Sequence, residues 1–168
     1  MVNQSIVDDK KIIDILVKEN YITSDDFKQS KAFADKNQAS PIDYLLSERL
    51  ITRELLGQAI AEFFRVPYVD LKKERMEEKV FGKVPELVAR SRGVIAFAKT
   101  SDGVKVGMVN PKDLEIIHLL EKRFNQRIIV YFITNQDLEE ALSGYKGGLR
   151  DDFKGVLDKL QDKKISRE

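Results

Sequence analysis

The stretch LGQAIAEFFRVPYVDL, residues 56–71, contains the change of sequence pattern that decides the fold. Its first part has the apolar spacing of an amphipathic helix, which we expect to end near Phe64 and Arg65. Pro67 closes this helix, because proline disfavours helical geometry in the residue before it. Residues 68–71 then alternate between two faces, as a short strand does. The sequence before this junction therefore predicts helices, and the sequence after it predicts mixed helix and strand.

Before the junction, the sequence predicts four helices that form a repeated pair. One constant offset aligns polar as well as apolar positions: Leu16 with Leu45, Glu19 with Glu48, Ile22 with Ile51, Thr23 with Thr52, and Gln29 with Gln58. Any two amphipathic helices would match at apolar positions, whereas the matching Glu, Thr and Gln favour a duplication. Two helix-turn-helix units, residues 11–34 and 40–63, are predicted to cover each other's apolar faces in a bundle.

Polar residues mark the ends of these helices. Asn20 suits the left-handed conformation that often ends a helix. Thr23 with Asp26 predicts a capping box at the start of the second helix. Ser40 followed by Pro41 predicts the start of the third, with a capping side chain and then proline at the first helical position.

After the junction, the sequence predicts helices and strands in turn. The charged run 72–79 is expected to be an exposed linker or a surface helix turn, and not a binding tail. Pro85 is expected at the first position of a short helix over residues 86–90. An Asp-Gly turn between two apolar runs, 94–99 and 104–109, predicts a β-hairpin.

The remaining elements complete a small sheet with helices against it. Gly107 inside a strand indicates a bulge or a closely packed neighbour. A helix is expected over residues 112–124, and its buried face should consist of Leu114, Ile117, Leu120 and Phe124. The apolar run 128–133 is typical of a central strand covered on both sides. Thr134 with Asp137 predicts the cap of a last short helix.

Together these elements predict an α+β protein. It would consist of an N-terminal helical bundle of two helix-turn-helix repeats, followed by a small α/β sandwich with a β-hairpin. We expect a helical module over residues 1–66, a small α/β domain over residues 67–145, and a charged linker or tail helix over residues 146–168.

Composition excludes several classes of protein. Lys and Arg number 29 against 28 Asp and Glu, so no overall field attracts nucleic acid or anionic lipid. The chain has no cysteine, which excludes disulfides and thiolate metal sites and suits a reducing cytosol. No apolar run approaches the ~20 residues of a membrane-spanning helix, and the first residues do not resemble a signal peptide.

The sequence also lacks the motifs of an enzyme. It contains neither a phosphate-binding loop nor a dinucleotide-binding glycine pattern. His118 is the only histidine, which is too little for a zinc site without cysteines. No serine, threonine or lysine stands in a recognisable nucleophile motif. We therefore predict a non-catalytic chain with no resident cofactor and no metal.

Two longer strings resemble one known family. They are LLSERLITRELLGQAIAEFFRVPYVDL, residues 45–71, and the segment 84–142, with its proline-led helix, Asp-Gly hairpin, Asn-Pro turn, helix and final strand. Both resemble the N-terminal domain of type II secretion and type IV pilus assembly ATPases (GspE/PilB-like, MshE N-terminal domain family). The resemblance covers roughly residues 11–142, and the order and spacing of the motifs carry it.

This resemblance implies a docking role. Such domains sit ahead of a RecA-like hexameric ATPase domain and dock the motor onto the cytoplasmic face of the inner-membrane assembly platform. The implied partners are the cytoplasmic domain of a platform protein and the C-terminal ATPase domain of the same or another chain. The implied location is cytoplasmic, peripheral to the inner membrane through partners, without direct insertion. The segment 150–164 resembles the start of a linker to a motor, which favours a fragment over a stand-alone adaptor.

A branch of this family binds cyclic di-GMP through two tandem motifs of the form RLGxxLVxxGxIxxxxLxxALxxQ, and the two repeats fall on these motifs. The departures from the pattern are Lys11 and Ser40 at the arginines, Ile13, Asn20, Ile42 and Arg49 at the glycines, and Ala34 and Phe63 at the glutamines. These losses keep the scaffold and remove most of the binding chemistry. The candidate positions of an altered site are Lys11, Leu16, Asn20, Leu45 and Arg49.

Three hypotheses follow. The favoured one is a protein-interaction module, with a partner-binding surface on the first helices. The alternative is a cyclic di-GMP sensor with degenerate motifs, in which Lys11→Ala or Arg49→Ala abolishes binding. The third is a DNA-binding adaptor, which predicts strongly salt-dependent duplex binding. The balanced charge, and acids such as Glu54 beside Arg53, speak against the third.

Overall fold

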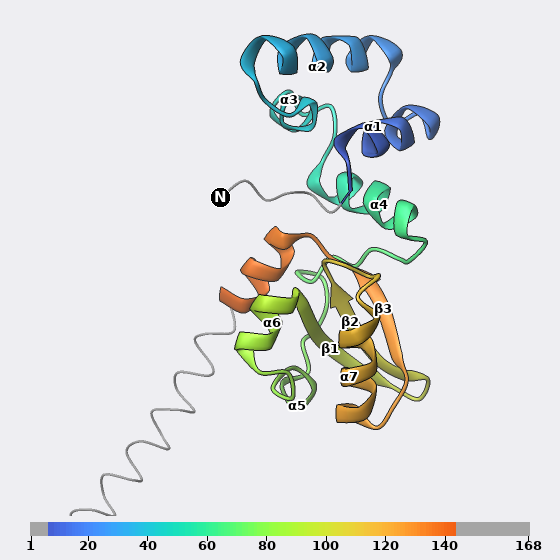
Figure 1. The fold of residues 1–168 in the computed structure, drawn as a ribbon, viewed down its shortest axis with the longest axis vertical. Helices are drawn as coiled ribbons and strands as arrows, with labels where there is room; N and C mark the ends of the chain where they lie inside the picture. Colours follow the sequence, from blue (N-terminus) through green and yellow to red (C-terminus); the bar gives the residue numbers. More distant parts are fainter. Residues whose placement is uncertain (1–6, 144–168) are drawn as a thin grey trace, which may run out of the picture.

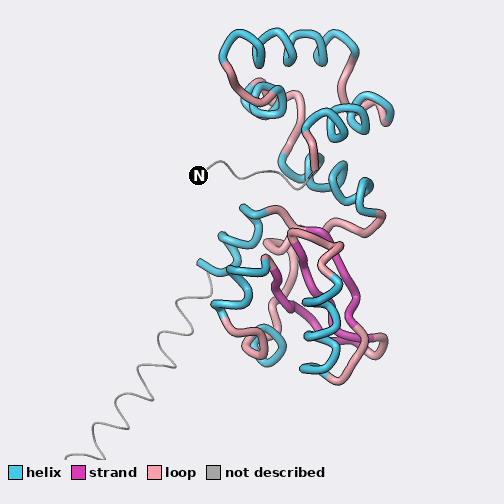
Figure 2. The backbone as a smooth tube through the Cα atoms, viewed as in Figure 1, coloured by secondary structure: helices cyan, strands magenta, loops and turns pink. Residues whose placement is uncertain are grey.

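The structure is a computed structural model that describes residues 7–143, and it confirms the α+β class. Helices alone form the upper half of the molecule in Figure 1, and all strands lie in the lower half, as the colours of Figure 2 show. The labelled elements of this region are α1 (Asp9–Lys18), α2 (Ser24–Asn37), α3 (Pro41–Ser47), α4 (Arg53–Phe64), α5 (Glu78–Phe81), α6 (Glu86–Arg92), β1 (Val94–Thr100), β2 (Gly103–Met108), α7 (Leu114–Phe124) and β3 (Ile128–Phe132). A further helix covers residues 135–143.

The helix ends of the upper half follow the predicted capping chemistry. Thr23 and Asp26 form the expected capping box at the start of α2, with each side chain accepting a hydrogen bond from the backbone N–H of the other residue. The Ser40 side chain accepts from a backbone N–H at the start of α3, and Pro41 is its first residue. Asn20 adopts the left-handed conformation that its residue type allows, with a φ of 58°. These caps set the directions in which the short helices leave their turns.

The sheet of the lower half has the order β1-β2-β3 within residues 7–143. β1 and β2 form the predicted antiparallel hairpin, and β2 pairs with β3 in parallel. The predicted close packing at Gly107 is present, because a Cβ there would lie 2.8 Å from Ile133 Cγ2. The bulge lies in β1 instead, where the register shifts between Ala96 and Ala98.

Two strand predictions were wrong. Residues 68–71 do not form a strand: a single parallel bridge joins Tyr68 to Phe132. The chain turns away soon after it, and the Asp70 side chain accepts from the N–H of Lys72 at 3.1 Å. β3 is the edge of the sheet and not its centre, because β2 occupies the middle position. Its apolar character has another cause, since Phe132 packs into the helical half.

Three helix predictions also need correction. Pro85 is the N-cap of α6 and not its first residue, and α6 continues to Arg92. α7 begins two residues later than expected, because Asp113 is its N-cap, and Leu114 is 63% exposed. The end of the charged run enters α5, a short helix that fits the expected surface helix turn, but α5 also buries apolar side chains against β1.

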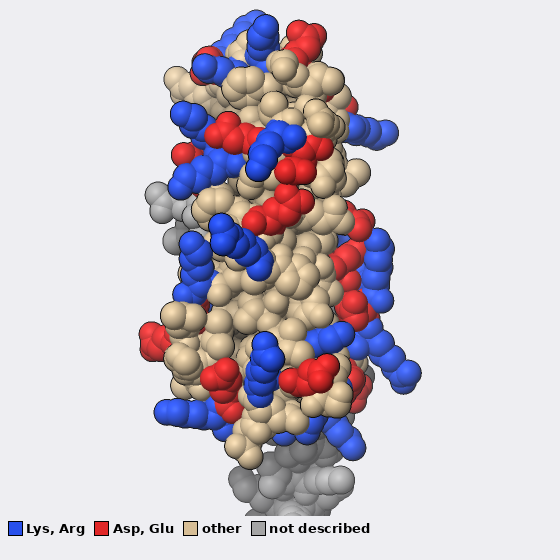
Figure 3. All heavy atoms as spheres, turned by 90° about the vertical axis from the view of Figure 1, so that its right-hand side faces the viewer, with Lys and Arg blue, Asp and Glu red and all other residues tan. Residues whose placement is uncertain are grey.

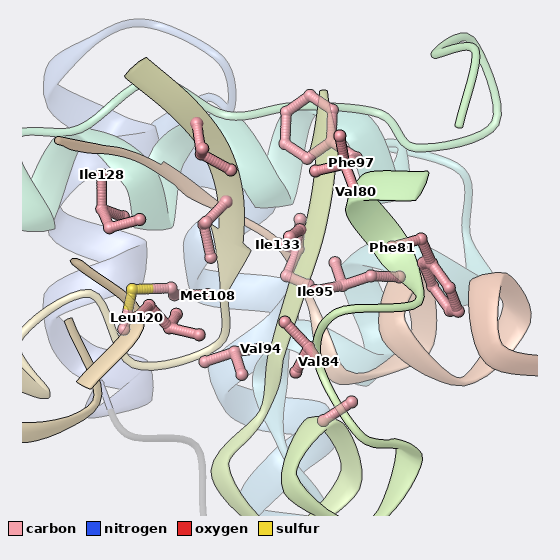
Figure 4. Close-up of a cluster of buried hydrophobic side chains, with 14 of the residues drawn as sticks. Val80, Phe81, Val84, Val94, Ile95, Phe97, Met108, Leu120, Ile128 and Ile133 are labelled. Carbon is pink, nitrogen blue, oxygen red and sulfur yellow. The ribbon is translucent and has the colours of Figure 1, made fainter. Parts of the chain in front are cut away.

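The described residues form two clusters of buried side chains. The lower cluster combines α5, β1, β2, α7 and β3, and Figure 4 shows side chains from all of these elements converging. The upper cluster combines α1, α3 and α4, and it includes Phe132. The division into three segments stays a proposal, and the predicted tail helix lies outside the described residues.

Candidate functional site

The two helix-turn-helix turns hold the candidate motif positions in the same backbone geometry. The carbonyl of Leu16 accepts the N–H groups of Tyr21 and Ile22 at 2.8 and 3.3 Å. The carbonyl of Leu45 accepts the two corresponding bonds at 2.9 and 3.3 Å. Both leucine side chains are fully buried in the upper cluster. Leu16 and Leu45 therefore shape the scaffold and are not free to contact a ligand.

Asn20 and Arg49, at positions where the motif would have glycine, adopt the left-handed backbone that glycine favours. Their φ angles are 58° and 56°, in the left-handed region that glycine adopts most readily. Both side chains are exposed, and neither makes a hydrogen bond or ion pair with any other residue between positions 7 and 143. The two turns therefore preserve the backbone of the motif and change the chemistry that it presents.

The side chains at the other expected glycine positions of the motif are buried in the core. Ile13 is 4% exposed and Ile42 is 7% exposed. A ligand cannot approach the backbone at these positions as it could at a glycine, because the isoleucine side chains fill the space. The glutamine position of the second repeat, Phe63, is half-buried beside Phe64, with the two ring centres 5.3 Å apart.

Among the candidate residues, Lys11 is the one that lies near an aromatic ring. Its Nζ lies 5.5 Å from the centre of the Phe63 ring. The Nζ of Lys112 lies 5.6 Å from the same ring and 6.0 Å from that of Phe64. Sequence reasoning identified Lys11 and missed Phe63 and Lys112 as its neighbours. No local signal could have found them, because the contact joins α1, α4 and the loop before α7.

A cleft runs along the boundary of the two halves. The smaller cavity, of about 80 Å³, lies between α4, the loop after it and the helix over residues 135–143. The larger, of about 300 Å³, lies between that loop and that helix. The residues that line them are Arg53, Glu54, Tyr68, Asp70, Leu71, Lys72, Met76, Thr134, Gln136, Asp137, Glu140 and Ala141. The larger cavity has an apolar part formed by Leu71, Met76 and Ala141.

The polar groups of this cleft are engaged with one another. The hydroxyl of Tyr68 donates to Asp137 Oδ2 at 3.1 Å, and Asp137 also caps the helix over residues 135–143, as predicted. Burial, and then the Asp137 carboxylate, raise the pKa of Tyr68 above its ordinary value, so the phenol stays protonated and donates. Lys72 pairs with Glu140 at 2.8 Å, a hydrogen bond that raises the pKa of the lysine. Across the boundary, Glu54 of α4 pairs with Lys73 at 3.2 Å. The described groups of this cleft include no activated nucleophile or base.

The described region has few other candidates for chemistry. His118 is exposed beside Glu121, at 3.3 Å. Between residues 7 and 143, no group of three His, Cys, Asp or Glu side chains is placed to hold a metal ion. No helix in that range is both long and apolar enough to cross a membrane.

Exposed apolar side chains occur on both halves of the molecule. In the upper half, Phe33 and Leu50 are each 37% exposed. In the lower half, Leu87 on α6 and Leu114 and Leu119 on α7 are exposed by 80, 63 and 53%. Figure 3 shows acidic and basic side chains interspersed on one face, around an area of other residues at mid-height.

Known proteins resemble this chain in sequence and in fold. A family model described as the MshEN domain matches residues 64–152. Among solved structures, one of MshE with cdg superposes with a TM-score of 0.56 at 18% identity, covering 80% of this chain and 97% of that one. One of the N-terminal domain of XpsE gives a TM-score of 0.45 at 11% identity, covering 78% of this chain and 90% of that one. No curated protein matches the sequence.

Proposed function

The chain belongs to the MshEN domain family, as the resemblance of its sequence predicted, and from this membership we propose a docking function. The chain would be the non-catalytic N-terminal docking and regulatory domain of a type II secretion or type IV pilus assembly ATPase. It would couple the motor to the inner-membrane platform from the cytoplasmic side. Its partners would be the cytoplasmic domain of a platform protein and the C-terminal ATPase domain.

The family match is the observation that carries this proposal, and the site chemistry supports it. The described carboxylates and bases of the cleft pair with one another, as Lys72 does with Glu140, and leave no group poised for turnover. The fold shared with MshE covers most of the chain.

We further propose that α1–α4 arose by duplication of one helix-turn-helix unit. The hydrogen bonds at the Leu16 and Leu45 carbonyls support this. Each carbonyl closes its own turn by accepting from two N–H groups, and these groups stand at corresponding positions of the two repeats. The left-handed residues Asn20 and Arg49 support it too, because each follows its helix at the same point. The pair would form the helical bundle that carries the partner surface.

The test is direct binding between this chain and the purified cytoplasmic domain of the platform protein, measured by titration calorimetry. We expect a saturable complex. Phe33→Asp should weaken it at least tenfold if the surface lies on the first helices, and Leu119→Asp should leave it unchanged. Leu119 is 53% exposed, whereas Phe33 is 37% exposed and lies 5.0 Å from the Tyr44 ring, so circular dichroism must first show that each variant keeps the fold. Absence of binding by the unaltered chain would contradict the docking function.

A second candidate is a cyclic di-GMP sensor with altered motifs. The observation that favours it is the preserved left-handed backbone at Asn20 and Arg49, together with an exposed cation at Lys11. Titration with cyclic di-GMP, with ATP and GTP as controls, tests it. Selective binding should fall with Lys11→Ala and Arg49→Ala and persist with Lys28→Ala, an exposed lysine outside the motif positions. No binding would eliminate the sensor and leave the docking module.

A further inference from the structure

Strand β3 forms one edge of the sheet, and its odd-numbered residues bond to β2. At the two ends of this pairing, the carbonyl of Arg127 accepts a hydrogen bond from β2, and the N–H of Ile133 donates one to it. The backbone groups of alternate residues point to opposite sides of a strand. Residues 128, 130 and 132 therefore direct their N–H and C=O groups to the outer edge, on the right of the molecule in Figure 1.

Only the last part of this outer edge is occupied within residues 7–143. The backbone of Phe132 donates to Pro67 and accepts from Val69. No residue in that range forms a hydrogen bond with the backbone N–H or C=O of Ile128 or Val130 on this side. Four neighbouring hydrogen-bonding groups are therefore open. Figure 3 views the molecule from this side and shows an area of uncharged side chains at mid-height.

The β3 edge also lacks the features that usually protect an exposed strand from pairing. Such features are a proline, a charged side chain, a bulge or a covering segment. The strand reads IIVYF and contains neither a charge nor a proline. The opposite edge, at β1, has a bulge between Ala96 and Ala98, and the carbonyl of Phe97 accepts from the N–H of Glu77. The fold thus protects one edge and leaves part of the other open.

Two cations lie beside the open groups. Arg127, directly before β3, is exposed, and Lys105 of β2 is the register partner of Ile129. Residues 127, 129 and 131 share one face of the sheet, and Lys105 Nζ lies 5.8 Å from the centre of the Tyr131 ring. Neither cation has a carboxylate oxygen within 4.0 Å among residues 7–143. A chain that pairs with β3 would therefore meet two unpaired positive charges.

We propose that the edge of β3 at Ile128 and Val130 binds an extended segment of a partner protein in which acidic and apolar residues alternate. The segment would add a strand to the sheet, and its backbone would satisfy the four open groups. Its side chains on the face of Arg127 and Lys105 would be acidic. Those on the other face, where Val130 is partly exposed, would be apolar. This surface goes beyond the docking function, because it lies in the lower half and not on the first helices.

Titration of the full chain with a synthetic heptapeptide of alternating valine and glutamate tests this surface. We expect saturable binding that is at least tenfold weaker when lysine replaces glutamate in the peptide, and slower hydrogen exchange at the N–H of Val130 in the complex. Arg127→Glu should remove the preference for the acidic peptide. The matched control is Arg49→Glu, which reverses the charge of an exposed arginine in the upper half and should leave the preference unchanged.

Two further changes separate strand addition from attraction between charges alone. Val130→Pro removes an N–H that points outward, which an edge strand tolerates, so the fold should persist and peptide binding should be lost. The acidic peptide with every backbone nitrogen methylated keeps its charges but has no N–H donors, and it should not bind to the unaltered chain. This second change leaves the protein intact, so it holds even if circular dichroism shows that Val130→Pro unfolds.

The outcomes decide between the occupants of the edge. No saturable binding of the acidic peptide, or equal binding of its methylated form, would overturn the proposal. A dimer in sedimentation that Val130→Pro abolishes would assign the edge to a second copy of the chain and refute the acidic segment. The titration with the platform protein tests the docking function separately, and neither result decides the other.

Discussion

Gly57 marks the closest approach between helix α4 and the loop that follows it. A Cβ at this position would lie 2.5 Å from the Tyr68 ring, a distance that non-bonded carbon atoms do not tolerate. The ring lies flat enough against the helix to leave its hydroxyl within reach of Asp137, at 3.1 Å. One missing methyl group therefore permits both the packing of the junction and its buried hydrogen bond.

Gly57→Ala should lower the free energy of unfolding by about 1–3 kcal/mol, because the ring must move. In a Tyr68→Ala background the same change should be neutral, or stabilising by about 0.5–1 kcal/mol, because alanine favours a helix over glycine. Urea unfolding of the four proteins of this double-mutant cycle measures the difference. Equal effects in both backgrounds would show that the tyrosine ring is not what excludes a side chain.

At the scale of the element, the start of α2 carries a pH-dependent cap. The backbone N–H of Thr23, and then its hydroxyl, hydrogen-bond Asp26 and hold the pKa of that carboxylate below its ordinary value near 3.8. A lowered pKa in the folded state means that the carboxylate contributes stability above its ordinary pKa. That contribution is lost as the pH falls through the lowered value.

Asp26→Asn should therefore destabilise the protein at neutral pH, and its difference from the unaltered chain should shrink as the pH falls below about 4. Urea unfolding between pH 2 and pH 7 measures this. Asp25→Asn is the control, because it removes a charge from the same first helical turn without the bond to Thr23. A difference that stays constant with pH would contradict the charged cap.

Local chemistry accounts for the elements that the sequence predicted correctly. Capping residues, an Asp-Gly turn and helical spacing act within a few residues, so Thr23, Ser40 and the hairpin could be read directly. Some errors are local and concern helix ends, as at Pro85 and Asp113. The others come from long-range packing. The place of β3 at the edge depends on a partner across the sheet, and the approach of Lys11 and Lys112 to the Phe63 ring depends on how the two halves meet.

Across the whole molecule, Phe132 joins the two halves. It is the last residue of β3, yet its side chain belongs to the upper cluster, 4% exposed and stacked on Phe64 with ring centres 5.8 Å apart. Its backbone adds two hydrogen bonds, donating to the carbonyl of Pro67 and accepting from the N–H of Val69. One residue thus connects the sheet to the helices through its ring, and to the loop after α4 through its backbone.

Phe132→Ala should cost about 3–5 kcal/mol and should split a single unfolding transition into two, because the upper helices would lose their contact with the sheet. Thermal unfolding followed by circular dichroism and by calorimetry tests this. Phe97→Ala is the control: Phe97 is equally buried but belongs to the lower cluster alone, so its loss should destabilise without splitting the transition. One transition in both variants would contradict the connecting role.

The position of Phe132 has a consequence for how the chain is made. The helices that end at Phe64 leave the ribosome first, but the ring that completes their core is encoded at the end of the last strand. At synthesis rates of roughly 5–20 residues per second, this half would wait for several seconds with one side of its core open. A nascent chain arrested between β2 and β3 would carry four formed helices whose shared core still lacks the Phe132 ring. A chaperone would meet the largest exposed apolar surface at this stage.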